Sequence, residues 1–377
     1  MHLFVAAFFL CGLMTFQIQA APGDLDTNFG TGGQVFTQIS QYTTIRVQIQ
    51  PDGKIVTISS DYWDDVDSFI SRHNADGTVD TTFGAGGYVQ LDYIVLFDFA
   101  IQPDGKLLGV GETRLGGETF AILRLNSNGT RDTGFGPNGV VTPPFNYSPR
   151  TAGTGVALQP EGKIVATGFA DSTQGLRSLL VRYQPDGTFD TSFGTNGTVV
   201  ETVSGLASEK ILVQSDGKLI VPGWLFISRY NANGILDDSF GTNGKVSTGY
   251  NDEIALQADG KILVTLSGTI KRLNPNGTPD TSFGTSGAVS NSFGISAIAI
   301  DDNGKILTAG HRDGTFAMSR YSPNGMIDTT FGTNGLVITP LGNNSAYNGI
   351  YDLTLQPDGK IVAAGFFGVA FIQVMSL

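Results

Sequence analysis

The stretch Asp190-Thr-Ser-Phe-Gly194 decides the fold, because the chain repeats its pattern Asp-(Thr/Asp)-x-Phe-Gly seven times. The copies begin at Asp26, Asp80, Asp132, Asp190, Asp237, Asp280 and Asp328. Their phenylalanines, Phe29, Phe83, Phe135, Phe193, Phe240, Phe283 and Phe331, are 54, 52, 58, 47, 43 and 48 residues apart. A period of about fifty residues indicates an architecture built from repeated supersecondary units.

Each unit reads as four short strands. In the second unit, apolar runs at 99–102, 107–110, 120–125 and 139–142 are separated by segments rich in Gly, Asn, Asp and Pro. A tetrad with Gly-Lys at its end recurs in every unit and ends at Lys54, Lys106, Lys163, Lys218, Lys261, Lys305 and Lys360. Asp-Gly between apolar runs is a hairpin signal. Four strands with tight turns in about fifty residues predict one blade of a β-propeller.

The two ends of the chain complement each other. The seventh unit has apolar runs at 352–356, 361–364 and 371–374 and lacks a fourth, whereas the N-terminal segment has the box at Asp26 and a run at 33–36 without three preceding strands. Ring closure removes open strand edges. We therefore predict an all-β, seven-bladed propeller over residues 21–377, with four-stranded antiparallel blades and the N-terminal strand closing the last blade.

Two phrases carry a family resemblance. Gln356-Pro-Asp-Gly-Lys-Ile-Val-Ala-Ala-Gly365 and Arg182-Tyr-Gln-Pro-Asp-Gly-Thr-Phe-Asp-Thr-Ser-Phe-Gly194 resemble the delta-60 repeat, a domain of unknown function. The resemblance covers nearly all of the chain after residue 20. It implies a β-propeller in an exported bacterial protein and no established activity. The final unit departs from the pattern, with Met375 where we expect the arginine of the other units.

The first twenty residues predict a signal peptide. Residues 3–16 are uncharged and mostly apolar, too short for a comfortable membrane span, and the small Ala20 offers a cleavage site. Cleavage would remove Cys11, the one cysteine. We expect a bacterial protein that is secreted, periplasmic or on the cell surface; a buried N-terminal strand is the alternative.

Charge limits the partners. The chain has 34 acidic and 22 basic residues, a net charge of −12, and 13 of the basic residues occupy repeat positions. Few remain to form a basic patch, so neither a nucleic acid nor an anionic membrane is expected as a partner. We expect a monomer without a membrane span.

The repeated residues favour a structural role. We expect the seven phenylalanines to fill the interfaces between blades and the repeat arginines to form buried ion pairs with the repeat aspartates. These arginines are Arg72, Arg124, Arg182, Arg229, Arg272 and Arg320. A ring of ligand-binding aspartates is the functional alternative.

The sequence offers no clear metal or catalytic signature. The turns of the type Asn-x-(Asp/Asn)-Gly-x-x-Asp partly resemble calcium loops, but a hairpin turn needs the same residues. We therefore predict no cofactor and no metal site and keep calcium as an alternative. After cleavage only His73 and His311 remain as histidines, and no cysteine remains. Three or more carboxylate or histidine side chains converging near the axis would favour an enzyme, whereas a channel plugged by side chains would favour a binding protein.

Differences between units concentrate on one face. In a propeller, the loops between strands two and three lie on the same face as the connections between blades. Here they hold irregular segments at 61–67, 112–118, 143–147, 171–177 and 341–347, and variable loops on a rigid frame commonly bind ligands. The candidate ligand-binding residues are Asp61, Tyr62, Trp63, Asp64, Asp65, Asp67, Arg114, Tyr147, Arg177 and His311. Our hypothesis is a non-catalytic scaffold that binds a protein, a glycan or a surface polymer; the alternative is a lyase or hydrolase with an acidic site at the channel mouth.

Overall fold

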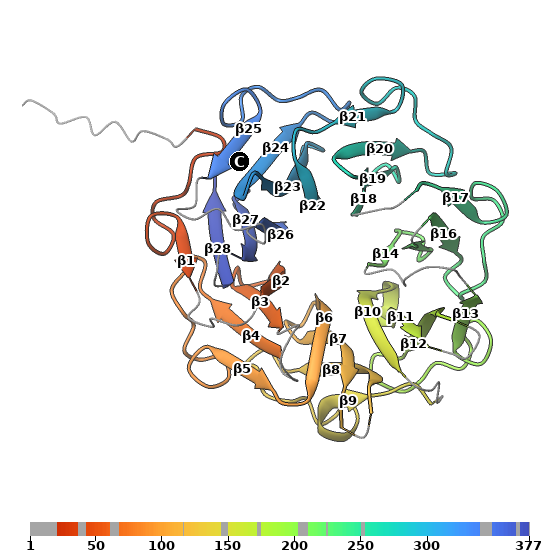
Figure 1. Ribbon diagram of the computed structural model, residues 1–377. Helices are drawn as coiled ribbons and strands as arrows, with labels where there is room; N and C mark the ends of the chain where they lie inside the picture. The colour runs from red at the N-terminus through yellow and green to blue at the C-terminus, as the bar shows by residue number, and fades with distance from the viewer. Residues whose placement is uncertain are drawn as a thin grey trace, which may run out of the picture.

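The computed structural model describes residues 21–36, 43–60, 68–115, 117–144, 150–171, 175–202, 210–223, 225–249, 253–339, 349–366 and 370–376. The described residues form seven four-stranded antiparallel sheets, arranged as blades around a central axis (Figure 1). The predicted seven-bladed β-propeller is therefore confirmed. Helical structure in these residues is limited to two single 3-10 turns, Pro137–Gly139 and Pro160–Gly162. None of the described helical segments is long enough to cross a membrane.

The strands of each blade follow one another from the axis outwards. Blade one has β2 (Thr43–Ile49), β3 (Ile55–Ser60), β4 (Ser68–His73) and β5 (Tyr88–Leu91). Blade two has β6 (Ile94–Ile101), β7 (Leu107–Thr113), β8 (Thr119–Leu125) and β9 (Val140–Val141). Blade three has β10 (Thr151–Leu158), β11 (Ile164–Ala170), β12 (Arg177–Tyr183) and β13 (Thr198–Thr202). Blade four has β14 (Leu212–Val213), β15 (Leu219–Pro222), β16 (Phe226–Tyr230) and β17 (Lys245–Ser247).

The remaining blades continue this order. Blade five has β18 (Ile254–Leu256), β19 (Ile262–Leu266), β20 (Thr269–Leu273) and β21 (Ala288–Ser290). Blade six has β22 (Gly294–Ile300), β23 (Ile306–Arg312), β24 (Thr315–Tyr321) and β25 (Leu336–Thr339). Blade seven has β26 (Gly349–Leu355), β27 (Ile361–Phe366), β28 (Ala370–Met375) and, from the N-terminal segment, β1 (Gln34–Phe36).

The ring is closed by β1. It pairs antiparallel with β28, with Val35 opposite Ile372, and so supplies the fourth strand that the last unit lacks (Figure 1). Beside this pair, Lys360 Nζ lies 3.0 Å from Asp26 Oδ2. This closure was predicted from the sequence and is confirmed.

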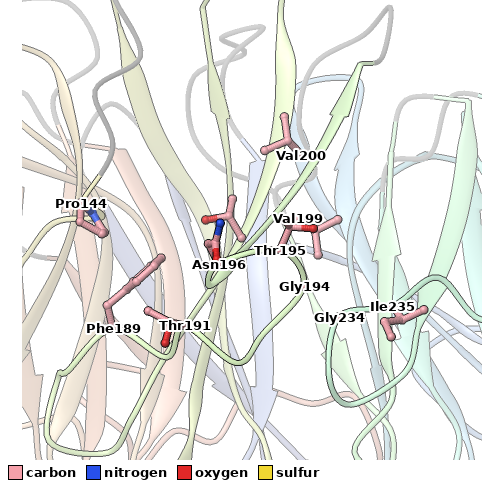
Figure 2. Close-up of a pocket in the computed structure, with 11 residues that line it drawn as sticks. Pro144, Phe189, Thr191, Gly194, Thr195, Asn196, Val199, Val200, Gly234 and Ile235 are labelled. Carbon is pink, nitrogen blue, oxygen red and sulfur yellow. The ribbon is translucent and has the colours of Figure 1, made fainter.

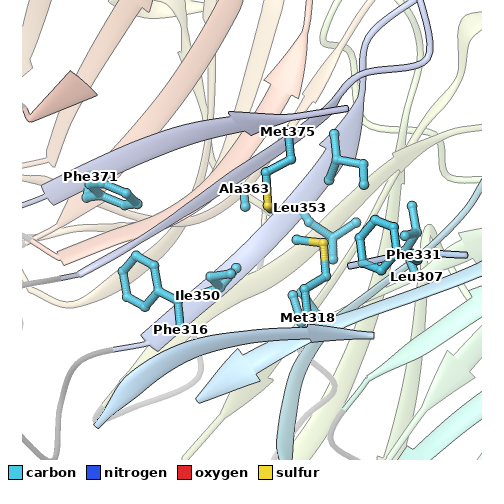
Figure 3. Close-up of a cluster of buried hydrophobic side chains, with 12 residues drawn as sticks. Leu307, Phe316, Met318, Phe331, Ile350, Leu353, Ala363, Phe371 and Met375 are labelled. Carbon is cyan, nitrogen blue, oxygen red and sulfur yellow. The ribbon is translucent and has the colours of Figure 1, made fainter. Parts of the chain in front are cut away.

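The hydrophobic core is divided among the interfaces between blades. The described buried residues form seven clusters, and each contains one repeat phenylalanine, at most 1% exposed. Figure 3 shows the cluster between blades six and seven, where Phe331 and Met318 lie near Leu353 and Met375. The glycine of each Asn-x-Asn-Gly type of turn leaves room for the phenylalanine of the preceding blade: a Cβ on Gly187, for example, would lie 2.8 Å from Phe135 Cδ2. The expected role of the phenylalanines at these interfaces is therefore observed.

Among the described residues, five of the six repeat arginines, all except Arg320, donate a hydrogen bond to a backbone carbonyl of the next blade. In blade three, Arg182 Nε lies 2.7 Å from Asp190 Oδ2, and the guanidinium carbon lies 4.7 Å from the centre of the Phe193 ring. Arg182 Nη1 donates a hydrogen bond of 2.6 Å to the carbonyl oxygen of Ala232 in blade four. The same aspartate contact and ring contact occur at Arg72, Arg124, Arg229, Arg272 and Arg320.

The repeat lysine contacts the aspartate in every blade and is the second cation in the six blades that carry the arginine. Lys163 Nζ lies 3.5 Å from Asp190 Oδ2, and the corresponding lysines make the same contact in the other blades. Burial alone would raise the pKa of Asp190. Hydrogen bonds from Ser192 and the charge of Arg182 outweigh burial, and the pKa lies below its usual value. A carboxylate with these partners stays ionised at neutral pH.

Strand register corrects one expectation about blade seven. The repeat arginine lies opposite the second residue of the neighbouring strand, as Arg320 lies opposite Leu307. In blade seven the corresponding partner of Val362 is Val374, and Met375 lies opposite Ile361. Val374, and not Met375, therefore occupies the arginine position. The sequence pattern placed the arginine position one residue too late, at Met375, because this unit has no turn after its third strand to mark the position.

Candidate functional site

The two faces of the ring differ in their chemistry. We call the face with the Asp-Gly-Lys and Asn-x-Asn-Gly types of turn the turn face, and the opposite face, with the loops between strands two and three and the connections between blades, the variable face. On the turn face, the expected calcium-like turns use their oxygens internally: Asp186 Oδ1 accepts hydrogen bonds from the backbone N–H of Thr188 (2.9 Å) and from its hydroxyl (2.8 Å). Asp76, Asn128 and Asn276 do the same. In the part of the chain that the structure describes, no three Asp, Glu, His or Cys side chains are grouped to hold a metal ion.

Part of the predicted site lies outside the described residues. This applies to Asp61, Tyr62, Trp63, Asp64, Asp65 and Asp67, and to Tyr147. The two residues that flank the first segment are described and buried. Ser60 Oγ lies 2.6 Å from Ser68 Oγ, and both hydroxyls bond the backbone of Leu96 in blade two, at 2.9 and 2.8 Å. The base of the blade-one loop is thus anchored to its neighbour.

The described candidates come from three different blades. Arg114 follows β7 in blade two, Arg177 begins β12 in blade three, and His311 lies in β23 of blade six. A Cβ on Gly294 would lie 3.1 Å from His311 Cε1, and one on Gly349 would lie 3.3 Å from His311 Cβ. The exposed His311 therefore lies where blades six and seven meet, across the ring from Arg114. The structure does not bring these two residues into one site.

The other histidine is part of the core. His73 ends β4 and is completely buried, and neither ring nitrogen has a hydrogen-bond partner among the described residues. Burial lowers the pKa of His73 to about 4, so the ring is neutral at physiological pH. It occupies the position that Leu125 and Tyr183 hold in other blades.

Arg114 belongs to a group of charges on the variable face. Its Nε lies 3.4 Å from Oε1 of Glu112, whose side chain is completely buried. Arg150, directly before β10, places Nη2 2.9 Å from Glu112 Oε2 and Nε 2.7 Å from Glu118 Oε2. The sequence placed Glu112 in a loop, but β7 continues to Thr113, so Glu112 is a buried strand residue. This network joins blades two and three.

A second charged group lies among the inner strands, and sequence reasoning missed it. It consists of residues four positions before the Gln of the turn phrase in five blades: Arg46, Asp98, Lys210, Glu253 and Asp352. Arg46 Nε lies 3.4 Å from Asp98 Oδ1, and Lys210 forms an ion pair with Glu253. In blades one, two and seven a β-bulge directly precedes the charged residue. Bulges redirect side chains at such positions.

Two of these carboxylates connect neighbouring inner strands. Asp98 Oδ2 accepts a hydrogen bond of 3.0 Å from the backbone N–H of Val156, and Asp352 Oδ2 one of 2.9 Å from Val47. Burial raises the pKa of Asp98 to about 6, although Arg46 and the Val156 N–H favour the charged form. Burial also raises the pKa of Asp352. The charge of Lys210 acts on all three carboxylates, Asp98, Glu253 and Asp352, and that of Arg46 acts on Asp98 and Asp352. The carboxylates of this group are thus accompanied by two cations.

The hollows on the surface include two that are lined by described residues. One, of about 760 Å³, crosses the outer side of blade three, between Pro144 of blade two and Ile235 of blade four (Figure 2). Its lining includes Phe189, Asn196 and Val200 and carries no charge. The other, of about 710 Å³, lies at the ends of the inner strands of blades six, seven, one and two, on the turn face. None of the candidate residues from the sequence lines either hollow.

The fold and the repeated contacts define the class of protein as a seven-bladed β-propeller. The chain belongs to the family described as "Domain of unknown function (DUF5122) beta-propeller", which matches residues 50–83, 102–135, 159–193, 214–240, 257–283, 302–331 and 356–371. The family resemblance noted in the sequence is thereby confirmed. None of the curated proteins compared with the chain matches it.

Solved structures support the fold at low sequence identity. A catalytically inactive virginiamycin B lyase from Staphylococcus aureus with quinupristin is 13% identical, with a TM-score of 0.58, over 91% of this chain and 98% of that chain. YCF48 bound to D1 peptide is 10% identical, with a TM-score of 0.55, over 95% and 99%. The WD40 propeller domain of Doa1 is 12% identical, with a TM-score of 0.52, over 91% and 97%. These proteins differ in function, so the similarity establishes the propeller alone.

Proposed function

We propose that this chain is an exported, non-catalytic β-propeller that binds a protein, a glycan or a surface polymer through its variable face. The contrast between the faces carries the proposal. On the turn face, blade after blade repeats the same aspartate, lysine and phenylalanine contacts. On the variable face, the blades present different groups, such as the Glu112–Arg150 network and the exposed His311. Different loops on a rigid repeated frame are suited to recognition.

The blade-one loop is the part of this face with the strongest sequence signal. It places Trp63 and Tyr62 between four aspartates, and exposed aromatic residues are frequent anchors at interfaces. The described support for it is the loop base, where Ser60 and Ser68 are tied to Leu96. A fixed base lowers the entropy that the loop would lose on binding.

The test is capture of a binding partner from the native envelope or medium with the protein lacking residues 1–20. We expect Trp63→Ala to weaken binding of the captured partner by about 2 kcal/mol, typical of an interface anchor, with little change in melting temperature. Met326→Ser, on a turn-face residue that is 67% exposed, is the matched control and should leave binding unchanged. Equal losses in both variants, or capture of nothing by the wild type, would contradict the proposal.

Export is part of the proposal and has its own measurement. Cleavage after Ala20 predicts a mature chain that begins at Ala21, which N-terminal sequencing of the protein from the culture medium or periplasm would identify. Recovery of the uncleaved chain from the cytoplasm would contradict export without affecting the binding experiment.

A second candidate function is catalysis, and the observation that favours it is the raised pKa of the buried Asp98. A pKa of about 6 suits a carboxyl group that gives and takes a proton near neutral pH. If the inner charged group that contains Asp98 is the active site of a lyase or hydrolase, the variant Asp98→Asn should lose turnover and still bind ligand through the variable face. Unchanged turnover in that variant would remove the candidate.

A further inference from the structure

The Glu112 network fixes two arginines from neighbouring blades on one buried carboxylate. Arg114 contacts Oε1 of Glu112 at 3.4 Å, and Arg150 contacts Oε2 at 2.9 Å through Nη2 and 3.0 Å through Nε. The Glu112 side chain is completely buried, whereas those of Arg114 and Arg150 are 32% and 35% exposed. A buried carboxylate requires paired cations, so Glu112 determines where both guanidinium groups lie.

The surrounding backbone restricts Arg150 further. The N–H of Thr151 donates a hydrogen bond of 3.0 Å to the carbonyl oxygen of Glu118, and the N–H of Asp171 donates one of 2.8 Å to that of Arg150. The guanidinium carbon of Arg150 lies 5.3 Å from the centre of the Phe169 ring, within the range of a cation–π contact. Arg150 is therefore held in place from three neighbouring segments.

Both arginines keep unused donors. A guanidinium carries five N–H groups. Among the described residues, Arg114 uses only Nε, and Arg150 uses Nε and Nη2. Nη1 and Nη2 of Arg114 and Nη1 of Arg150 have no protein partner in this part of the chain. Two guanidinium groups held together with free N–H groups can bind an oxyanion, since their planar geometry matches a carboxylate.

The acidic surroundings restrict what carries that oxyanion. The chain has a net charge of −12, so a ligand with many negative charges is repelled. Asp171, whose charge acts on Arg150, lies beside the arginines and can accept hydrogen bonds from hydroxyl groups. A ligand with one carboxylate among many hydroxyls fits both features, and this is the chemistry of a uronic acid in a mainly neutral glycan.

We propose that Arg114 and Arg150 bind the carboxylate of a uronic acid residue in such a glycan. The proposal rests on the proposed binding through the variable face and gives that face a ligand class. Glu118 illustrates the contact, because its carboxylate lies 2.7 Å from Arg150 Nε. It also competes with a ligand carboxylate, so its removal should strengthen binding.

The experiment is calorimetric titration of the protein lacking residues 1–20 with a xylo-oligosaccharide that carries one glucuronic acid branch. The unbranched oligosaccharide and a neutral peptide with a single glutamate are the comparison ligands. We expect at least tenfold weaker binding of both comparison ligands, and at least tenfold weaker binding of the branched sugar by Arg114→Gln. Glu118→Gln should bind it two- to fivefold more tightly. Arg312→Gln, a partly exposed arginine at the variable-face end of β23, is the matched control and should bind normally.

Equal affinity for branched and unbranched sugar, tighter binding of the peptide, or normal binding by Arg114→Gln would each overturn the proposal. If Arg114→Gln fails to fold, Arg114→Lys replaces it, and it should also weaken binding because lysine lacks the planar pair of donors. The partner captured from the native envelope separates the two proposals. If Arg114→Gln captures it normally while Trp63→Ala does not, the uronate site is wrong and the binding function remains.

Discussion

Lys360 Nζ lies 3.0 Å from Asp26 Oδ2, and this contact joins the last complete turn phrase of the chain to the first aspartate box. In the other blades the same pair comes from residues of one unit, as in Lys163 and Asp190. Closure of the ring therefore uses the same contact as the interior of a blade.

Removal of residues 21–36 should open blade seven. The truncated chain loses β1 and also Phe29, which is 1% exposed between blades seven and one. We expect a loss of at least 3 to 5 kcal/mol of stability, roughly the cost of a buried Phe→Ala change, together with aggregation through the exposed edge of β28. Chemical unfolding and size-exclusion chromatography measure both effects.

The point variants Phe29→Ala and Phe36→Ala form the control pair for that truncation. Phe36 belongs to the same segment and is 47% exposed. Phe29→Ala should cost about 3 to 5 kcal/mol and Phe36→Ala clearly less. A truncated chain that melts like the intact one and stays monomeric would show that β1 does not close the ring.

Replacement of Arg182 by valine tests the contact between blades three and four. Valine occupies this position naturally in blade seven, as Val374. Arg182→Val should cost about 3 kcal/mol or more, because it leaves the buried Asp190 with Lys163 as the one cation among its described partners. The double variant Arg182→Val, Asp190→Asn should recover part of the loss, since the unpaired charge is gone. Equal stability of both variants in urea unfolding would argue against the ion pair.

Acid should weaken the fold through the repeat aspartates. Their folded pKa values lie below 3.8, the ordinary value of an aspartate, so their stabilising effect is complete above that pH and declines as the pH falls further. We expect the melting temperature to drop steeply below about pH 3.8, with a smaller drop in the variant Arg182→Val, Asp190→Asn. A melting temperature that is flat from pH 4 to about pH 2 would contradict this expectation.

Asp98 should have the opposite effect in a different pH range. Its folded pKa of about 6 lies above the unfolded value of 3.8, so proton uptake by the folded state increases stability as the pH falls from about 6 towards 3.8. Asp98→Asn removes this dependence. As the pH is lowered from about 7 to about 4, the melting temperature of the wild type should therefore rise relative to that of Asp98→Asn. A constant difference over this range would show that Asp98 is ionised throughout.

The sequence was sufficient for the fold because the contacts between blades are made by repeated residues. Phe193, Asp190 and Arg182 recur with the same spacing, and identical spacing in each unit implies identical geometry. The arginine position of the last unit was predicted at Met375 instead of Val374, because the turn that fixes this position in the other units is missing there.

The charged groups were harder to predict because they differ from blade to blade. Arg46, Asp98 and Glu253 share a position before the turn phrase but not a residue type, so no repeated letter marks them. Glu112 was noticed, but its burial depends on Arg150 from the next blade, a contact between residues far apart in the sequence. The inner group could have been predicted from its place in the repeat, four residues before the Gln of the turn phrase, if charged residues of either sign had been counted together.

The valine at position 374 makes the blades unequal in their local stability. Six blades hold a guanidinium group over the repeat phenylalanine, while Phe29 lies beside an aliphatic residue instead. The contacts between blades seven and one include the hydrogen bonds from Gly30 N–H to the carbonyl oxygen of Asp76, 2.8 Å long, and from Val47 N–H to Asp352 Oδ2, 2.9 Å long, but no repeat arginine. Transient opening of the ring, and with it amide hydrogen exchange, should therefore begin at blade seven. Six of the seven blades thus carry a repeat arginine, and the blade at which the ring closes does not.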